Sequence, residues 1–357
     1  MGVFDIATRT AGRARYAAAQ GLRSAWYGAQ MSAARRRASG FDRPGEPTFQ
    51  PTRGQPDLAV LRRAYFELFI KDRLNVEAGL YPAPSDVRLK DLPKALRSAR
   101  AFREDVEDVD RRRLERNGTE VRQQVTDGHN RYPAYYLQNF HYQSGGWFTE
   151  DSADIYDTQV EALFTGTADA MRRAVLVEIS RELRGRDQRG VSLLDVACGN
   201  GRFLSQVMQV YPRLMASGLD LSPTYTDAAR TRLKPWKQVE ILHEAAEAMP
   251  VEDNSLDMVV SIFLFHELPP RVREKVLAEI RRVLKPGGLF ILADSAQFGD
   301  YSDLDGLLEY FPHGFHGPYY KSYLSWDAVQ ACDLTGLVPE TQSLAFLTKI
   351  STFRRSS

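Results

Sequence analysis

The sequence predicts an α/β protein in which a parallel β-sheet follows a helical N-terminal part. From about residue 187 onward, short apolar runs alternate with segments of helical periodicity, which is typical of βαβ units. Residues 50–125, in contrast, show only helical patterns. The chain has 357 residues, more than the ~100–200 of an average domain. We therefore expect a basic, loosely ordered extension (1–48), a helical domain that ends in an aromatic lid (49–150) and a sheet domain (151–357).

The overall composition excludes several classes of protein. Hydrophobic residues make up 43% and charged residues 26%, which excludes a collagen-like or globally disordered chain. No run approaches the ~18 consecutive apolar residues of a membrane span. The net charge of +1 gives no argument for a nucleic-acid partner, because phosphate binding needs a basic excess. Two cysteines, Cys198 and Cys332, offer no disulfide framework and indicate a reduced, cytoplasmic protein.

The first 48 residues differ from this average. They contain eight arginines, no lysine and three acidic residues. A solvated or loosely docked extension is the simplest interpretation. Peripheral contact with a membrane surface and an organelle transit peptide are the alternatives, and both stay open. Because Phe4, Leu22 and Trp26 share a helical face with Arg15, the polar and apolar faces are not cleanly separated. Removal of residues 1–45 is expected to leave turnover intact.

Three helices are expected before the sheet. The first begins after Asp57 as its N-cap and ends at Gly79, which suits the position after a helix C-terminus. The second runs from about Leu92 to Arg116 and is stopped by Asn117 and Gly118. A third helix over residues 156–176 is expected to join the N-terminal part to the sheet domain.

The sheet domain shows a regular alternation of elements. Short apolar runs predict strands at 191–197, 216–221, 239–243, 256–263 and 289–294. Helical patterns fill the intervals at 203–210, 223–232 and 270–284, and one more helix is predicted at 325–335. The last two runs, 338–344 and 346–354, are close enough in sequence to form an antiparallel hairpin.

One segment between the helical part and the sheet is unusually aromatic. Residues 132–148 contain seven Phe, Tyr or Trp side chains in seventeen positions, in neither a helical nor an alternating pattern. One interpretation is a connector that packs into the core. The other is a lid whose rings cover a ligand while polar groups orient it. In the lid interpretation Tyr135, Tyr136 and His141 face the pocket, and His141 or Asn139 lies near the ligand.

The clearest motif is LLDVACGNGRFL at residues 193–204. A buried strand ends near Asp195, and Gly199 and Gly201 then form a tight turn into a helix, where a ligand can approach the backbone closely. Asp220 ends the next strand about twenty residues after this turn. A carboxylate there suits the two hydroxyl groups of a ribose. The chain lacks a P-loop lysine, and DVACGNG lacks the third glycine of a dinucleotide site.

Together with PVEDNSLDMVVS and RVLKPGGLFILAD further on, these segments resemble class I S-adenosylmethionine-dependent methyltransferases. The resemblance is greatest to the branch that includes ubiquinone and menaquinone methyltransferases. It covers about residues 187–295 and extends more loosely to the C-terminal hairpin. It implies a Rossmann-like, seven-stranded α/β sheet with its last strand antiparallel, S-adenosylmethionine as cofactor, and methyltransferase activity.

The resemblance also implies which residues bind the cofactor. Asp220 would bind the ribose diol, Leu221 would pack on the adenine, and Phe263 would lie under the methionine part. Ala245 stands where an aspartate often holds the adenine amino group, so the backbone of Ala246 is expected to serve the ring. The complete implied set is Asp195, Ala197, Gly199, Gly201, Asp220, Leu221, Ala246 and Phe263.

Candidates for catalysis and substrate binding lie elsewhere. His266 follows the fourth strand in FLFHELPP and, with His141, is a candidate general base, because the pKa of histidine suits proton transfer near neutrality. The alternative for His266 is a loop-ordering or helix-capping role. His313 and His316 lack a third ligand nearby, so no metal is predicted. The predicted substrate contacts are Tyr135, Tyr136, Asn139, Glu267, His316, Tyr319 and Tyr320.

The predicted function is methyl transfer to a small, aromatic or lipophilic acceptor. A non-catalytic cofactor-binding protein of regulation or assembly is one alternative. A nucleic-acid or protein methyltransferase is the other, and it is disfavoured because FLFHELPP stands in place of an Asn-Pro-Pro-Tyr-type motif. The acceptor, its reacting atom and the oligomeric state stay open.

Overall fold

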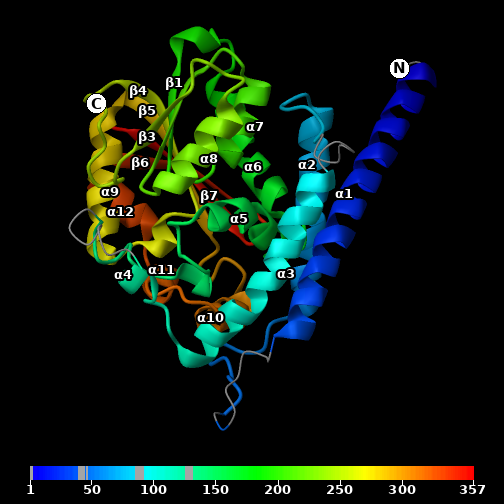
Figure 1. The fold of residues 1–357 in the computed structure, drawn as a ribbon. Helices are drawn as coiled ribbons and strands as arrows, with labels where there is room; N and C mark the ends of the chain where they lie inside the picture. Colours follow the sequence, from blue (N-terminus) through cyan, green and yellow to red (C-terminus); the bar gives the residue numbers. More distant parts are fainter. Residues whose placement is uncertain (1–2, 39–44, 46, 85–91, 125–131) are drawn as a thin grey trace.

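The computed structural model of the protein describes residues 3–38, 45, 47–84, 92–124 and 132–357 (Figure 1). Its centre is one seven-stranded sheet with the strand order β3-β2-β1-β4-β5-β7-β6. The first five strands are parallel, and β7 runs antiparallel to both of its neighbours. This confirms the predicted seven-stranded, Rossmann-like sheet. The strands are β1 (Ser192–Val196), β2 (Met215–Asp220), β3 (Glu240–His243), β4 (Leu256–Ile262), β5 (Leu284–Ser295), β6 (Leu337–Ala345) and β7 (Thr348–Arg355).

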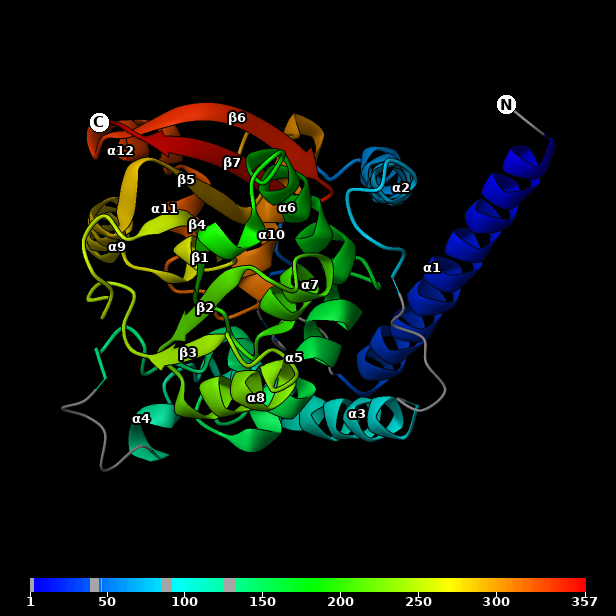
Figure 2. The same ribbon diagram turned by 90° about the horizontal axis from the view of Figure 1, so that it is seen from above.

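Helices cover both faces of the sheet (Figure 2). Alternate strand residues point to opposite sides, so that Leu193 packs with the helices of one face and Leu194 with those of the other. One face is covered by α6 (Ala168–Glu182), α7 (Arg202–Val210) and α8 (Pro223–Leu233). The other face is covered by α9 (Pro270–Val283), α11 (Tyr320–Leu324) and α12 (Ala328–Leu334). The four helices predicted between residues 203 and 335 are thus confirmed within a few residues.

The N-terminal part is helical, as predicted. It contains α1 (Val3–Arg37), α2 (Leu58–Glu77), α3 (Leu92–Glu115), the short α4 (Val121–Gln124) and α5 (Glu150–Leu163). Helix α2 begins after Asp57, whose side chain accepts hydrogen bonds from the backbone N–H groups of Ala59 and Val60. A short 3₁₀ turn (Phe140–Tyr142) interrupts the aromatic segment, and α10 (Asp305–Gly314) follows β5 after a loop. Further 3₁₀ turns lie at Gln188–Gly190, Phe265–Glu267 and Ser302–Leu304.

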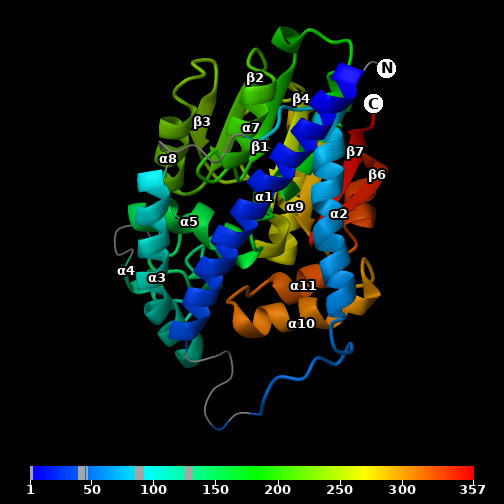
Figure 3. The same ribbon diagram turned by 90° about the vertical axis from the view of Figure 1, so that its right-hand side faces the viewer.

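The expected loosely ordered extension is instead an ordered helix that packs on its neighbours (Figure 3). Tyr16 of α1 donates a hydrogen bond to the buried Asp72 of α2. Farther along, Arg23 is buried and pairs with acids of α5 and α6, and Ala34 packs against Phe102 of α3. These buried contacts correct the prediction. The sequence could not indicate them, because each partner lies far away in the chain. Membrane contact through this basic segment stays a prediction.

The single helix predicted over residues 156–176 is wrong. The chain forms α5 and α6, with a turn between them in which Thr165 has φ +52° and Gly166 has φ +84°. A side chain at Gly166 would place its Cβ 3.1 Å from the Cα of Ser24 in α1. Because Gly166 has no side chain, α1 can pack close to this turn. Arg23 of α1 donates a hydrogen bond to the Gly166 carbonyl there, at 3.3 Å.

In the parts of the chain that the structure describes, no helix is both long enough and apolar enough to cross a membrane.

Candidate functional site

The glycine turn joins β1 to α7 at the carboxyl edge of the sheet. Ala197, Gly199 and Gly201 all have positive φ values, of +61°, +55° and +74°. At Gly201 a Cβ atom would lie only 2.9 Å from Leu233 and 3.2 Å from Ala229, both in α8. Gly201 therefore allows α7 and α8 to pack closely, while its left-handed backbone turns the chain into α7.

Asp220 at the end of β2 faces this turn. Its Oδ2 accepts a hydrogen bond from the Gly199 N–H at 2.8 Å, and its Oδ1 accepts one from the Ser222 N–H at 2.9 Å. Burial raises the pKa of Asp220 above its ordinary value, although these backbone donors oppose the shift. Because a carboxylate offers about four acceptor positions, Asp220 can accept further hydrogen bonds from a ligand.

A cavity with about 780 Å³ of empty space opens beside Asp220. Six of the eight predicted cofactor residues line it: Ala197, Gly199, Asp220, Leu221, Ala246 and Phe263. Asp195 and Gly201 do not line it. Asp195 is buried, and its Oδ2 has no hydrogen-bond partner among the described residues.

Aromatic side chains form much of the opposite wall. Tyr135 and Tyr136 line the cavity together with Gly199, which confirms their predicted direction. Trp147 also lines it and stacks on Phe140 with ring centroids 4.3 Å apart, and its carbonyl accepts a hydrogen bond from the Ser222 side chain. Four aromatic residues that were not predicted as site residues also line the cavity: Trp147, Phe140, Tyr156 and Tyr225. The first two lie in the aromatic segment 132–148. The remaining lining residues are Leu219, Glu244, Ile262, Leu264, Glu267 and Leu268.

The prediction that Asn139 contacts a ligand is wrong. Asn139 is fully buried, its Oδ1 accepts from the Val121 N–H at 2.9 Å, and its Nδ2 donates to the Gln143 carbonyl at 3.0 Å. Its amide therefore holds the aromatic segment in place. The segment is both a packed connector and one wall of the cavity, so each of the two sequence interpretations was correct in part.

Glu267 belongs to a cluster of two histidines and two carboxylates, whose other members are His141, His266 and Asp294. Nε2 of His141 is 2.8 Å from Oε1 of Glu267, and Nε2 of His266 is 3.5 Å from the same oxygen. On its other side, Nδ1 of His266 lies 2.5 Å from Oδ1 of Asp294. Glu267 lines the cavity, whereas His141 and His266 are not among its lining residues, which corrects the prediction that His141 faces the pocket. The donor atoms of His141, His266 and Glu267 lie within 4.8 Å of one another, an arrangement that could hold a metal ion.

The charges of this cluster change the expected role of His266. Burial alone would lower the pKa of His266, but Asp294 and Glu267 outweigh it and raise that pKa to about 10. Burial would raise the pKa of Glu267, but the two histidines lower it to about 2. His266 therefore carries a proton near neutrality in this arrangement and has no lone pair to act as the predicted base. Glu267 is ionised and can accept a hydrogen bond, although its low pKa makes it a weak base.

Three predicted substrate residues do not line the cavity. Tyr320 is buried in α11, where its hydroxyl bonds the Ser295 hydroxyl at 2.7 Å and its ring meets that of His266 edge-on. A ring nitrogen of His316 lies 3.0 Å from the side-chain amide of Gln138. Tyr319 uses its carbonyl to accept from Arg273 at 3.0 Å. Tyr320 is buried within its helix, whereas His316 and Tyr319 precede the helix and are partly exposed, and none of the three lines the cavity, which corrects the prediction.

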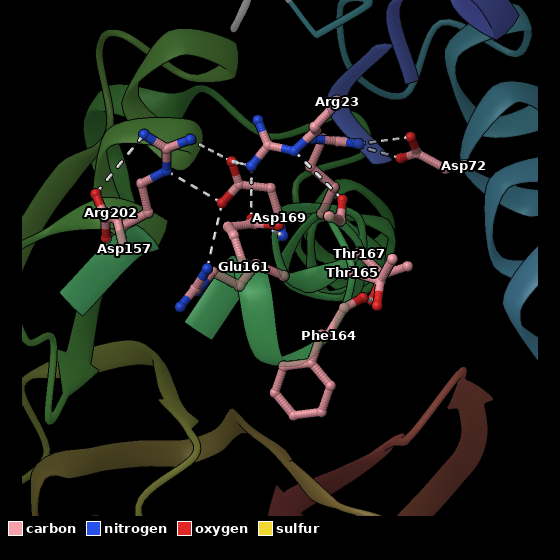
Figure 4. Close-up of polar contacts among 12 residues, drawn as sticks. Arg23, Asp72, Asp157, Glu161, Phe164, Thr165, Thr167, Asp169 and Arg202 are labelled. Carbon is pink, nitrogen blue, oxygen red and sulfur yellow. Dashed lines mark hydrogen bonds and ion pairs between the residues drawn. The ribbon is translucent and has the colours of Figure 1, made fainter. Parts of the chain in front are cut away.

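Acidic side chains of α5 and α6 hold the glycine turn by hydrogen bonds and an ion pair; Figure 4 shows Asp157, Asp169 and Arg202. Asn200, in the turn itself, donates to Asp157 of α5 at 3.0 Å. Arg202, which begins α7, donates to Asp169 of α6 at 3.1 Å. No sequence spacing indicates these pairs, because they join separate helices.

Known proteins resemble part of this chain. A family model described as "Methyltransferase domain" matches residues 193–288. Demethylmenaquinone methyltransferase from Bacillus pumilus is 33% identical over 113 residues, which is 31% of this chain and 47% of the relative. The same enzyme from Listeria monocytogenes is 34% identical over 115 residues, 31% of this chain and 48% of the relative. The chain thus spans about half the length of the curated relatives it matches.

Two solved structures have a partly similar backbone. A SAM-dependent methyltransferase from Aquifex aeolicus has 21% identity and a TM-score of 0.40, and the match covers 52% of this chain and 89% of that one. A TehB-like SAM-dependent methyltransferase from Corynebacterium glutamicum has 18% identity and a TM-score of 0.41, covering 58% of this chain and 100% of that one. The matched segment contains the glycine turn, Asp220 and strands β1 to β4. Residues 193–288 are therefore similar in sequence to a methyltransferase domain.

Proposed function

We propose that the protein binds S-adenosylmethionine in the cavity beside Asp220 and transfers its methyl group to a small, uncharged, aromatic or lipophilic acceptor. The observation that carries the proposal is that the glycine turn and the Asp220 carboxylate face one cavity with an aromatic wall. When bound, the cofactor supplies a methyl group whose bond to sulfur breaks, with its electron pair staying on sulfur, as the bond to the acceptor forms.

The residues present fit this cofactor. Asp220 has free acceptor positions for a ribose diol, and the backbone at Gly199 lacks a Cβ that would hold a ligand away. Leu221 and Ala246 offer apolar surface for a purine ring, and Phe263 closes the cavity at the end of β4. The unpartnered Oδ2 of Asp195 lies in the strand that leads into the turn. These groups would hold the nucleoside and the methionine part.

The wall of the cavity selects the class of acceptor. Among the described residues that line it, none is Lys or Arg, whereas Asp220, Glu244 and Glu267 are acidic. A phosphate or carboxylate on the acceptor would therefore meet repulsion with no cation to pair with. The rings of Tyr135, Tyr136 and Trp147 favour a flat apolar molecule instead. They also exclude water from the site, which assists a displacement that depends on positioning.

Glu267 is placed to accept a hydrogen bond from a hydroxyl or amine group of the acceptor. Its Oε2 has no hydrogen-bond partner among the described residues, while Oε1 faces the two histidines. A hydroxyl or amine of the acceptor could donate to Oε2 and be oriented by it. His266 and His141 keep the carboxylate ionised for that purpose.

Cofactor binding is tested by isothermal titration calorimetry with S-adenosylmethionine and S-adenosylhomocysteine. The wild-type protein is expected to bind both, and Asp220→Ala is expected to bind them at least ~10-fold more weakly, since a charged hydrogen bond is worth roughly 1.5–3 kcal/mol. Asp227→Ala is the matched control, because this exposed aspartate on α8 pairs only with Arg230 among the described residues. Equal affinity in wild type and Asp220→Ala would contradict the proposed cofactor site.

Methyl transfer is tested with methyl-labelled cofactor and a metabolite extract. Label is expected in molecules that pass into an organic solvent. Label in protein or nucleic acid would favour the macromolecular alternative. Cofactor binding without labelled product from any extract would favour the non-catalytic alternative.

A further inference from the structure

We propose that His141, His266 and Glu267 form a binding site for a divalent transition-metal ion, with zinc as the reference ion, at the edge of the acceptor cavity. The site is not encoded as a local motif, because His141 lies in the aromatic segment and the other two follow β4. The metal site itself stands on the geometry of these three side chains. Its role in methyl transfer rests on the proposed function.

The donor atoms are spaced as ligands of one ion. Oε1 of Glu267 is 2.8 Å from Nε2 of His141 and 3.5 Å from Nε2 of His266. Two tetrahedral ligands that share a zinc ion at about 2.0–2.2 Å lie roughly 3.3–3.6 Å from each other. Glu267 and His266 already have this spacing, whereas the 2.8 Å between Glu267 and His141 is a hydrogen-bond distance that would lengthen when an ion binds. All three donor atoms lie within 4.8 Å of one another. A small rotation of the half-exposed His141 ring would therefore complete the set without a change of backbone.

Asp294 supplies the support that metal-bound histidines need. Its Oδ1 lies 2.5 Å from Nδ1 of His266, and its Oδ2 accepts from the Phe265 N–H at 2.8 Å. A carboxylate on the far nitrogen directs the other ring nitrogen of a histidine to the metal and fixes the orientation of the ring. In His266 that other nitrogen is Nε2, the atom that faces Glu267, and an ion bound there would take the place of the proton that this nitrogen carries in the metal-free protein. Asp294 is itself completely buried at the end of β5.

Two polar atoms of the cluster have no explained partner. Oε2 of Glu267 and Nδ1 of His141 are buried and make no hydrogen bond among the described residues. The Glu267 residue is only 4% exposed and lines the cavity. An unpartnered carboxylate oxygen in such a place is costly, and a cation bound by this carboxylate would offset the cost.

The backbone around His141 is strained in a way that serves this placement. His141 and Tyr142 have φ values of +54° and +60°, which residues other than glycine rarely adopt. The His141 N–H donates to the His316 carbonyl at 2.8 Å, so that a separate segment holds the strained turn. Strain of this kind persists where surrounding contacts impose it, and it concentrates at functional sites.

Two histidines with one glutamate are a donor set for zinc and for other first-row divalent ions, and they leave coordination positions open. Since Glu267 borders the cavity, an open position can take the oxygen of a hydroxylated acceptor. The ion would lower the pKa of that hydroxyl, whose proton passes to water. The resulting oxygen anion forms its bond to the methyl carbon while the carbon–sulfur bond of the cofactor breaks. The acceptor class is thereby narrowed to molecules with a phenol-like or enol-like hydroxyl.

Metal binding is measured on full-length protein without an affinity tag, after treatment with a chelator and dialysis. Zinc chloride titrated in a calorimeter is expected to bind at one equivalent, and cobalt chloride is expected to give visible absorption bands of a low-coordinate site. Glu267→Gln and His141→Gln should weaken zinc binding at least ~10-fold. Asp294→Asn should weaken it ~10–100-fold, as expected of a residue that orients a ligand. The matched control is His313→Gln in α10, where the wild-type ring stacks on that of Phe49; this variant should bind zinc as the wild type does.

Thermal unfolding of each variant shows whether it is folded. Absence of zinc binding by the wild type, or unchanged affinity in folded Glu267→Gln and His141→Gln, overturns the metal site. Titration of the chelator-treated protein with S-adenosylmethionine separates this proposal from the proposed function. Cofactor binding without zinc binding refutes the metal site alone. Zinc binding without cofactor binding refutes the proposed function and leaves the metal site standing.

Discussion

Nη2 of Arg23 in helix α1 donates a hydrogen bond to Oδ2 of Asp169 in α6 at 2.9 Å, and both side chains are buried. Asp169 also accepts from Arg202, which follows Gly201 directly. Helix α1 is therefore connected through one carboxylate to the turn that faces the candidate cofactor cavity. Burial would raise the pKa of Asp169, but Arg202 and Arg23 together hold it well below its ordinary value.

Arg23→Ala should strongly destabilise the protein. It leaves Glu161 and Asp169 buried with one cation fewer, and breaking a buried ion pair costs about 3–5 kcal/mol. Urea unfolding followed by circular dichroism measures the effect, and the exposed Arg15→Ala is the control on the same helix.

We also expect removal of residues 1–38 to weaken cofactor binding, in contrast to the expectation from sequence. A shortened protein with full stability and affinity would show that the Arg23 pairs are dispensable.

Gly201→Ala should reduce both stability and cofactor affinity. The added Cβ meets Leu233 at 2.9 Å, and the φ of +74° is unfavourable for alanine, which together should cost about 1–3 kcal/mol. Gly185→Ala provides the comparison, because Gly185 has φ +77° with nothing within 4 Å of its added Cβ. The difference between the two variants in thermal unfolding isolates the contact with α8. Identical losses would mean that backbone strain alone explains the need for glycine.

Asp257 at the start of β4 should stabilise the fold except at low pH. Burial would raise its pKa, but hydrogen bonds from Lys285, Ser192 and Arg186 lower it from 3.8 to about 2. A pKa that folding lowers contributes stability above the unfolded value, and this stability disappears as the pH falls from about 4 toward 2. Asp257→Asn should therefore lower the Tm at pH 7 and reduce its fall between pH 4 and 2. A parallel Tm profile for wild type and Asp257→Asn would contradict this role.

Trp147→Leu should impair turnover more than folding. The ring of Trp147 stacks on Phe140 and closes one side of the cavity, so leucine would admit water and loosen the acceptor. Once an acceptor is found in the extract assay, its KM should rise at least ~10-fold, while cofactor affinity changes less. Trp236→Leu is the control, since Trp236 packs against the core and is not among the lining residues. A normal KM in Trp147→Leu would show that the aromatic wall does not contact the acceptor.

Local sequence patterns determined the regular elements and the cofactor side of the site. Strand β1, the glycine turn and Asp220 are close in sequence, and their order along a βαβ unit places them at one edge of the sheet. Apolar periodicity likewise predicted the helices that cover the sheet, because burial of one face repeats with the helical period. The aromatic density of residues 132–148 correctly predicted that Tyr135 and Tyr136 reach the cavity.

Only the tertiary structure decided which polar side chains meet. His141 contacts Glu267 at 2.8 Å across 126 positions of sequence, and His266 finds Asp294 on a neighbouring strand. Asn139, two residues before His141, is buried in the interior, where it accepts a hydrogen bond from the Val121 N–H. Likewise, arginines that looked solvated in sequence include Arg23, which is buried against acids of two other helices. Charges and hydrogen bonds of this kind depend on long-range packing, which local periodicity does not encode.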